Sequence, residues 1–300
     1  MGSLQARVVE RTTELFSHAP DPLSSTQSYR GDPGLFGPGS TTWELLGDPA
    51  AFVGGIRALL VQAAHPEVLA GVVDHSRFRE DPLGRLSRTS AYVTATTYGA
   101  MAEVEAAIAA VRRAHRGVVG RSSRGRPYAA DDPGHAAWVH QVLVESFLVA
   151  FETYGPRALE AGEADRFVAE QVELGRLLGA APLVDTAAAL HRWIEEHPDL
   201  GRGDGIAETV GFVLHPPLSR GVRVAYRLLA EAAVVTIPER IRRILGLVAR
   251  PGARPAGRLA VAGLRWALGA SPAWYRALRR VGAPIPEGRF RPARIAGLGE

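Results

Sequence analysis

The sequence predicts an all-α protein with a single multi-helix domain. Apolar residues recur at spacings of three and four along most of the chain, and alternating strand-like runs are nearly absent. The clearest stripe passes through Met101, Val104, Ile108, Val111 and His115, which share one face of a helix. With 46% apolar and 22% charged residues, the 300-residue chain has the composition of an ordinary globular protein.

Proline, glycine and acidic residues mark the expected helix boundaries. The stretch 20–40 is crowded with Pro, Gly and Ser, so we expect residues 1–34 to form an irregular lead-in. Residues 35–250 are expected to form the domain, and residues 251–300 a basic amphipathic C-terminal segment. Within the domain the pattern predicts helices over 48–69 with a break at His65-Pro66, then 85–100, 101–118, 138–154 capped by Asp131-Asp132-Pro133, 161–179, 184–197, a helix ending at His215, 219–235 and 238–249.

Two residue types are missing altogether. The chain has no cysteine, which excludes disulfides, iron–sulfur clusters, thiolate metal sites and thiol nucleophiles. Every one of its 35 basic residues is arginine, which excludes Schiff-base enzymes, Walker P-loops and kinases. The remaining options are chemistry by His, Asp, Glu, Ser, Thr, Tyr and Arg, or by a cofactor that these residues can hold.

No apolar run is long enough to span a bilayer, and Met1 to Phe16 lacks the apolar core of a signal peptide. We therefore expect a cytoplasmic protein.

Positive charge is concentrated near the C-terminus. Residues 239–300 hold 13 arginines and 3 glutamates, a net charge of +10, which leaves −6 for residues 1–238. Residues 256–281 alternate apolar and aromatic residues with arginine, a pattern typical of a helix at a membrane surface or at a partner. Packing against the protein's own acidic body is the main alternative, and docking to a second subunit is another. No nucleic-acid-binding motif accompanies the arginines.

The histidines are the first candidates for chemistry. His65, His197 and His215 each precede a proline, which favours roles at turns and helix ends. His115 lies on the apolar stripe, where an imidazole either bonds to a neighbouring helix or binds a metal. His140 on the next helix presents the same two possibilities.

A polar face on the helix 85–100 is the second candidate. Arg85 and Thr89 are four residues apart, and Tyr92 and Thr96 extend the same face. A cation and hydroxyls that face inward would suit an anionic or dioxygen-bearing ligand. A solvated amphipathic helix would give the same pattern.

Several short motifs resemble the MpaB/rubber-oxygenase superfamily. They occur in the family's order over residues 30–250: Ala58-Leu59-Leu60-Val61-Gln62-Ala63-Ala64-His65-Pro66, Asp74-His75-Ser76-Arg77-Phe78, Asp81-Pro82, Gly84-Arg85-Leu86, Arg88-Thr89, Tyr98-Gly99, His115 with Val118 and Gly120, Gly125 with Pro127-Tyr128 and Ala130, Trp138-Val139-His140, and Pro238.

The resemblance implies an all-α fold with a globin-like helical core and haem b bound through one histidine. His115 best matches the iron ligand, and Arg85 and Thr89 match the haem-proximal pair to which we assign catalytic and cofactor-binding roles. The implied activity is O₂-dependent hydroxylation or C=C cleavage of a small apolar substrate. The glutamate proposed as a distal base in latex-clearing proteins has no clear match upstream of Arg85.

Two other functions stay open on the sequence. One is a haem- or ligand-binding helical protein without turnover. The other is a haem-free helical enzyme that uses acid–base groups such as His140 and Glu145. The sequence does not name the substrate, the electron donor or the oligomeric state, and an oligomer is compatible with it.

Overall fold

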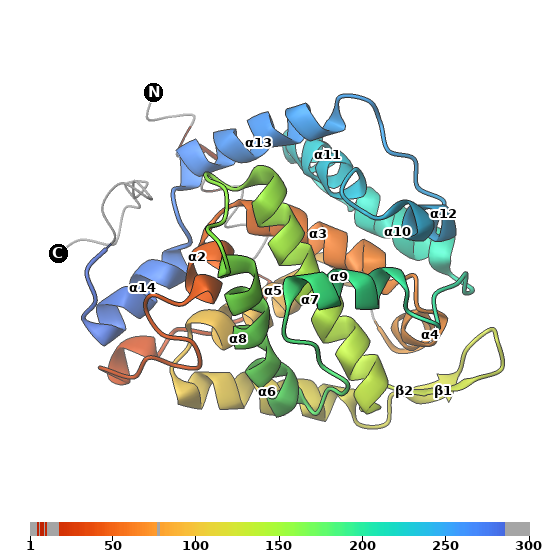
Figure 1. Ribbon diagram of the computed structural model, residues 1–300, viewed down its shortest axis with the longest axis horizontal. Coiled ribbons are helices and arrows are strands. Elements are labelled where there is room, and N and C mark those ends of the chain that lie inside the picture. Colours follow the sequence, from red (N-terminus) through yellow and green to blue (C-terminus); the bar gives the residue numbers. More distant parts are fainter. Residues whose placement is uncertain (1–4, 6, 9, 11–17, 77–78, 286–300) are drawn as a thin grey trace.

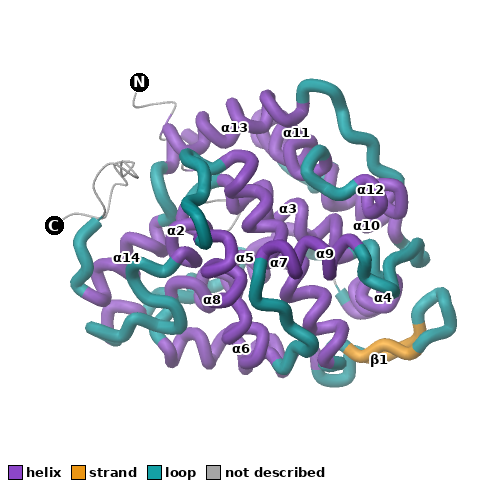
Figure 2. The backbone as a smooth tube through the Cα atoms, viewed as in Figure 1, coloured by secondary structure: helices purple, strands orange, loops and turns teal. Residues whose placement is uncertain are grey.

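The computed structural model describes residues 5, 7–8, 10, 18–76 and 79–285. In this part of the chain the structure contains thirteen α-helices, one 3-10 turn and one two-stranded hairpin, so the all-α prediction is confirmed (Figures 1 and 2). In chain order the elements are η1 (Thr26–Ser28), α2 (Thr41–Gly47), α3 (Ala50–Gln62), α4 (Pro66–His75), α5 (Pro82–Tyr98), α6 (Met101–His115), β1 (Val119–Arg121), β2 (Pro127–Ala129), α7 (Pro133–Tyr154), α8 (Glu163–Leu178), α9 (Ala187–Glu195), α10 (Ile206–Leu214), α11 (Arg220–Val234), α12 (Glu239–Leu245), α13 (Ala253–Leu268) and α14 (Pro272–Val281).

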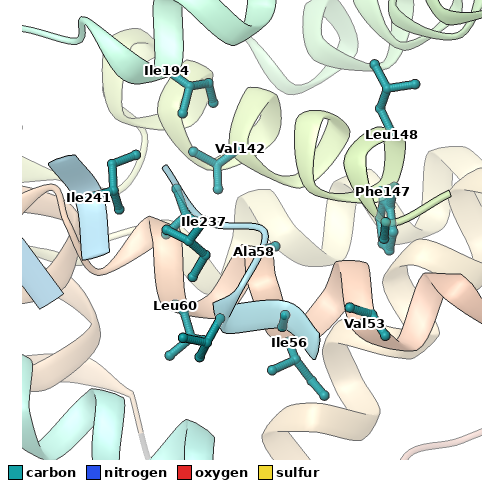
Figure 3. Close-up of a cluster of buried hydrophobic side chains, with 14 of the residues drawn as sticks. Val53, Ile56, Ala58, Leu60, Val142, Phe147, Leu148, Ile194, Ile237 and Ile241 are labelled. Carbon is teal, nitrogen blue, oxygen red and sulfur yellow. The ribbon is translucent and has the colours of Figure 1, made fainter. Parts of the chain in front are cut away.

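The helices α3 and α7 form the centre of the molecule. They pack against each other more extensively than any other pair of described elements, and α8, α9, α10, α11 and α13 surround them (Figure 1). Close approach depends on Gly54, because a Cβ atom there would lie 2.6 Å from the Phe147 ring and 3.1 Å from the Ser146 carbonyl oxygen. Figure 3 shows the apolar side chains that this packing brings together, among them Val53, Leu60, Val142, Leu148 and Ile241.

A buried ion pair joins the same two helices. The guanidinium of Arg57 binds both carboxylate oxygens of Glu145 and donates a hydrogen bond of 2.8 Å to Ser146 Oγ. His191 Nδ1 on α9 lies 3.2 Å from Glu145 Oε1, which also accepts from Arg57. Burial raises the pKa of Glu145, but the Arg57 charge and the hydrogen bonds from His191 and Arg57 outweigh it, so that the pKa is lowered overall.

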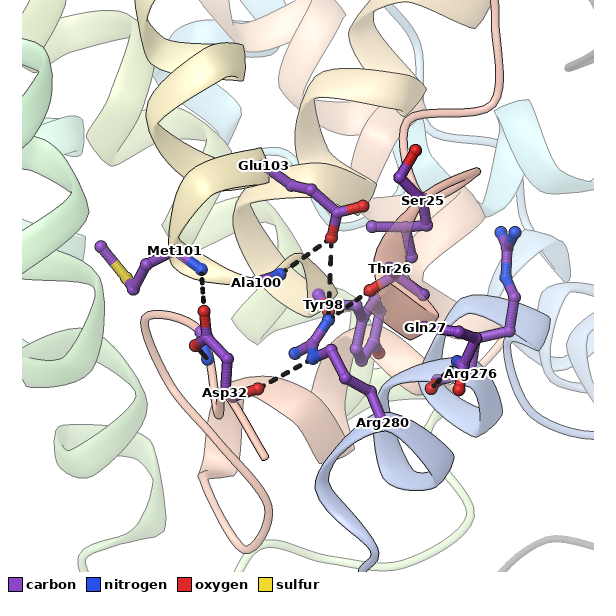
Figure 4. Close-up of polar contacts among 12 residues, drawn as sticks. Ser25, Thr26, Gln27, Asp32, Tyr98, Ala100, Met101, Glu103, Arg276 and Arg280 are labelled. Carbon is purple, nitrogen blue, oxygen red and sulfur yellow. Dashed lines mark hydrogen bonds and ion pairs between the residues drawn. The ribbon is translucent and has the colours of Figure 1, made fainter. Parts of the chain in front are cut away.

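The turn between α5 and α6 is fixed by the C-terminal helix. Arg280 on α14 is 2% exposed, and its guanidinium donates hydrogen bonds to Thr26 Oγ1 (2.6 Å) and to the carbonyl oxygens of Tyr98 (2.7 Å) and Asp32 (2.8 Å) (Figure 4). The Asp32 carboxylate in turn accepts the Met101 N–H at 3.0 Å. One arginine thus ties the N-terminal segment, α14 and the α5–α6 turn together.

The basic C-terminal segment packs on the body of the protein. Trp274, Tyr275 and Leu278 are buried, and Arg265 binds the buried Asp48 carboxylate at 2.6 Å while Arg276 binds Asp21. These contacts are those expected if the segment packs against its own body. Membrane contact through 256–281 and contact with a second subunit stay predictions.

No single described helix is long and apolar enough to cross a bilayer. The pair α3–α4 passes the length and composition test only jointly, with a bend of 101° between its two helices.

Two elements differ from the sequence prediction. The helix α2 falls where we expected no helix, and it is capped by the preceding Ser40, whose hydroxyl accepts the Trp43 N–H. The hairpin β1–β2 falls between two expected helices, and its strands are only three residues long. Part of the expected lead-in lies outside the described residues. So do Arg77 and Phe78 of the family motif and residues 286–300 of the C-terminal segment.

Candidate active site

The polar face predicted on α5 is present, and two of its members have no partner. Asp81 caps the helix by accepting the Gly84 N–H, so that Arg85 and Thr89 lie in its first two turns. Thr89 Oγ1 donates to the Arg85 carbonyl oxygen at 3.1 Å. Within the described residues, neither the Arg85 guanidinium nor the Tyr92 hydroxyl makes a hydrogen bond or ion pair, although both side chains are more than half buried.

The electrostatics of these two groups follow from their burial. Burial lowers the pKa of Arg85, and the nearby charge of Arg88 lowers it further. Burial alone raises the pKa of Tyr92 above its usual range. A buried guanidinium without a counter-ion is costly, and an anionic ligand would remove that cost.

Arg85 lies in the wall of a mostly apolar pocket between α3, α4, α5 and α10, which we call the Arg85 pocket. Its outline covers about 290 Å³, much of it open to solvent, and about 20 Å³ of it can hold the centre of a water molecule. The one other hydroxyl in its wall, Thr209 Oγ1, is buried and without a hydrogen-bond partner in the described structure. The lining residues are Leu59, Gln62, Ala63, Val68, Leu69, Val72, Arg85, Thr209 and Val213.

Open space continues along the α3 face on which Leu59 and Gln62 lie. Gly55 is on the same face, one turn before Leu59, and a Cβ atom built there would have no neighbour within 4 Å. Phe52, a further turn back, is only half buried. The helix α3 packs on α7, α11, α10 and α2, whereas α5 packs on α6, α2 and α14. Among these contacts α3 and α5 share only α2 as a neighbour, and each contributes to the wall of the Arg85 pocket.

His115 is the last residue of α6, and its ring is partly buried. Burial lowers its pKa, while the Asp131 charge and a hydrogen bond to the Ala130 backbone oppose that shift. The ring is therefore neutral at pH 7, with one nitrogen tied to the backbone. His115 is not among the residues that line the Arg85 pocket, so the structure places the two predicted groups on neighbouring helices without bringing them into contact.

His140 and Glu145, the acid–base groups of the haem-free alternative, do not face a common site. His140 is buried on α7, and its Nε2 donates to the Gln171 carbonyl oxygen at 2.9 Å. Glu145 is occupied by Arg57 and His191. Both side chains satisfy their hydrogen bonds in the core rather than face a common space.

Sequence comparison identifies the family. Residues 43–270 match the family described as ER-bound oxygenase mpaB/B′/rubber oxygenase, catalytic domain. The chain belongs to this family. The MpaB/rubber-oxygenase match runs from α2 through α13, and so contains both the Arg85 pocket and His115. No curated protein and no solved structure matches the chain, and the globin-like core stays a prediction.

The residues of this MpaB/rubber-oxygenase domain fit haem b in two respects. His115 offers an imidazole that burial keeps neutral, with the Ala130 backbone beside one nitrogen, as is usual for metal-ligating histidines. Arg85 is a cation without a partner among the described residues, which suits a propionate carboxylate. The size of the pocket does not fit: a space of about 20 Å³ has room for about one water molecule, so a porphyrin would need the further space beside Gly55.

The structure also brings together three residues that the sequence did not connect. His65 and His197 lie at a helix start and in a turn, as their prolines predicted, but both are also close to Asp199. Their positions are far apart in the sequence, and no local spacing signals the cluster.

Proposed function

We propose that this oxygenase-family protein is a haem-b-dependent oxygenase that acts on a small apolar substrate and O₂. The observation that carries the proposal is the Arg85 guanidinium, which has no partner among the described residues, in the wall of a mostly apolar pocket, one helix away from His115, whose ring burial keeps neutral. When bound, haem iron supplies the centre at which dioxygen is activated.

The protein's own residues would hold the cofactor and the substrate. His115 provides the iron ligand, and the Ala130 backbone fixes the orientation of its ring. Arg85 neutralises a propionate. The apolar wall from α3, α4 and α10 binds the substrate and excludes water, which strengthens electrostatic interactions inside the pocket.

Thr89 and Tyr92 supply hydroxyls on the same face of α5. In the structure the Thr89 hydroxyl donates within its own helix, so it accepts hydrogen bonds from a ligand unless its side chain rotates. Tyr92 keeps its proton at all ordinary pH values because burial raises its pKa, and its hydroxyl could donate a hydrogen bond to a substrate.

The test is the absorption spectrum of the purified protein, oxidised and reduced, for the wild type and two variants. We expect a haem spectrum in the wild type, loss of haem in His115→Ala, and retention in the folded fraction of His140→Ala. Haem content per folded chain is the measurement. A colourless wild type supplied with haem during expression would contradict the proposal. If His140→Ala is colourless while His115→Ala keeps haem, the iron ligand is His140 on α7 and not His115.

A further inference from the structure

We propose that His65, His197 and Asp199 form a second site, which binds one divalent transition-metal ion. One ligand atom from each residue lies within 4.8 Å of the others. Two imidazoles and a carboxylate are ligands that Zn²⁺ and Fe²⁺ accept, and three protein ligands leave coordination positions open for water or another ligand.

The His65 side chain is buried and poorly satisfied. It is 3% exposed, and its Nδ1 makes no hydrogen bond within the described residues. The nearest carboxylate oxygen is Glu67 Oε2 at 3.4 Å, which is also buried and without a hydrogen-bond partner in this part of the chain. Glu67 is held in place because its other oxygen accepts a 2.8 Å hydrogen bond from Ser122 Oγ.

This arrangement is that of a metal ligand and its supporting carboxylate. A metal-bound histidine usually donates its second N–H to a carboxylate, which fixes the tautomer and orients the ring. Glu67 stands on one side of the His65 ring and can take that role.

Aromatic rings hold His65 and His197 together. Their ring centroids are 5.4 Å apart, and the His197 ring lies 4.9 Å from Trp138 and 4.7 Å from Trp193. Asp199 follows in the same turn, and its backbone N–H donates a hydrogen bond of 3.3 Å to His197 Nδ1. Metal–ligand bonds of about 2.0–2.2 Å would draw the three ligand atoms closer together.

Arginines at the tip of the β1–β2 hairpin lie at the site, and one of them pairs with its carboxylate. Arg126 binds Asp199 Oδ1 at 2.5 Å, and Arg124 donates to the Asp199 carbonyl oxygen. Asp199 is partly exposed, so an ion can enter from solvent at this edge. Since a cation at Asp199 disfavours a second cation nearby, Arg126 is a natural means of testing the assignment.

The experiment is a Zn²⁺ titration of the full-length, chelator-treated protein against a chromogenic competitor. We expect one Zn²⁺ per chain, with affinity reduced on the order of 100-fold in His197→Ala and in Asp199→Asn. The exposed His215, which contacts only its own helix, gives the control: His215→Ala should bind as the wild type does. Arg126→Gln should tighten binding by roughly two- to fivefold, because it removes the competing cation.

A second readout reports where the ion sits. Co²⁺ in place of Zn²⁺ should quench part of the tryptophan fluorescence, since Trp138 and Trp193 lie against His197, and Asp199→Asn should abolish the quenching. The inference is wrong if the wild type binds no Zn²⁺, or if His197→Ala and Asp199→Asn both bind it unchanged. His115→Ala should bind Zn²⁺ normally, so failure of the haem proposal would be visible separately.

Discussion

At the scale of single residues, the molecule keeps several polar groups in apolar surroundings, and they fall into two kinds. Glu145 and His140 are buried, and their hydrogen bonds to Arg57 and to the Gln171 carbonyl oxygen hold helices together. Arg85 and His65 are buried or nearly so and keep hydrogen-bonding capacity unused. Unused capacity of this kind is costly in a folded protein, and it is the residue-level sign of a ligand site.

Removal of the Arg85 charge should weaken haem retention. Arg85→Gln keeps most of the side-chain volume but loses a charge-assisted hydrogen bond to a carboxylate, so we expect haem affinity to fall about 10- to 100-fold. Arg88→Gln is the matched control, because Arg88 is exposed and pairs with Asp81. The measurement is the rate of haem transfer to an apoprotein acceptor. Equal rates for the two variants would remove Arg85 from the cofactor site.

Acid should destabilise the fold through buried histidines. Burial lowers the pKa of both His65 and His140 to about 4, from 6.5 in the unfolded chain. Between pH 6.5 and pH 4 the unfolded chain therefore binds protons that the folded chain does not, and the free energy of unfolding decreases as the pH falls, by about 3 kcal/mol per histidine at most. His191, whose pKa is raised by its hydrogen bond to Glu145, acts with the opposite sign above pH 6.5.

Urea unfolding at pH 7 and pH 4.5 measures this effect. In His140→Gln the loss of stability between the two pH values should be smaller by roughly half, whatever the variant costs at pH 7. A variant as sensitive to acid as the wild type would show that His140 titrates normally in the folded state.

At the scale of secondary-structure elements, the periodicity of the sequence was sufficient for most of the fold. Proline or glycine at 66, 82, 99, 133, 155 and 272 marks real helix ends, and the two short C-terminal helices separate at Ser271-Pro272. The helix α2 was missed because it is short and directly follows a Gly- and Pro-rich stretch, where the Ser40 cap is the local signal. The hairpin was missed because three-residue strands carry too little alternation.

The candidate sites were predictable to different degrees. Arg85 and Thr89 share a helical face by their spacing alone. The stripe on α6 places His115 on an apolar face, but its role as an iron ligand comes from the family resemblance and stays a prediction. That Arg85 has no partner among the described residues could not be predicted, because it depends on which side chains the fold brings around it. His65 and His197 meet Asp199 only through tertiary packing of the α3–α4 and α9–α10 turns, which no local pattern encodes.

Adjacent glycines on α3 should respond to substitution in opposite ways. In Gly54→Ala the new methyl group meets the Phe147 ring and main chain, and we expect a loss of about 1–3 kcal/mol. In Gly55→Ala the methyl group meets nothing within 4 Å, and the better helix propensity should stabilise the protein by about 0.5–1 kcal/mol. Urea midpoints of the two single variants measure both effects. Destabilisation by Gly55→Ala would mean that the space beside α3 is closed in solution.

At the scale of the whole molecule, the acidic body and the basic C-terminal segment are joined by specific ion pairs and by a buried aromatic cluster. Deletion of residues 251–300 should therefore cost much of the stability, because Trp274, Tyr275 and Leu278 would leave the core. Thermal unfolding of the deletion variant measures this. A deletion variant with the stability of the full chain would contradict it.

The full-length protein and the variant that lacks residues 251–300 also test membrane contact. Sedimentation with anionic vesicles should be unchanged by the deletion if the segment only packs on its own body. Leu259 and Trp266 on the outer side of α13 are exposed. If the full chain binds vesicles, Trp266→Ser should reduce binding without loss of stability, and if it does not, the lipid-anchor alternative is wrong.

The clamp at the α5–α6 turn has a consequence for how the protein moves. Arg280 holds the Tyr98 end of α5, where residues 95–98 are fully buried, while most residues between 85 and 94 are only half buried. Because α5 is held at its Tyr98 end, we expect the largest movements at its N-terminal end, which carries Arg85. Amide protons near Arg85 should therefore exchange with solvent faster than those near Tyr98, and their exchange should slow down when a ligand binds. On this account the N-terminal half of α5 moves to admit a ligand while the helices around α3 and α7 stay fixed.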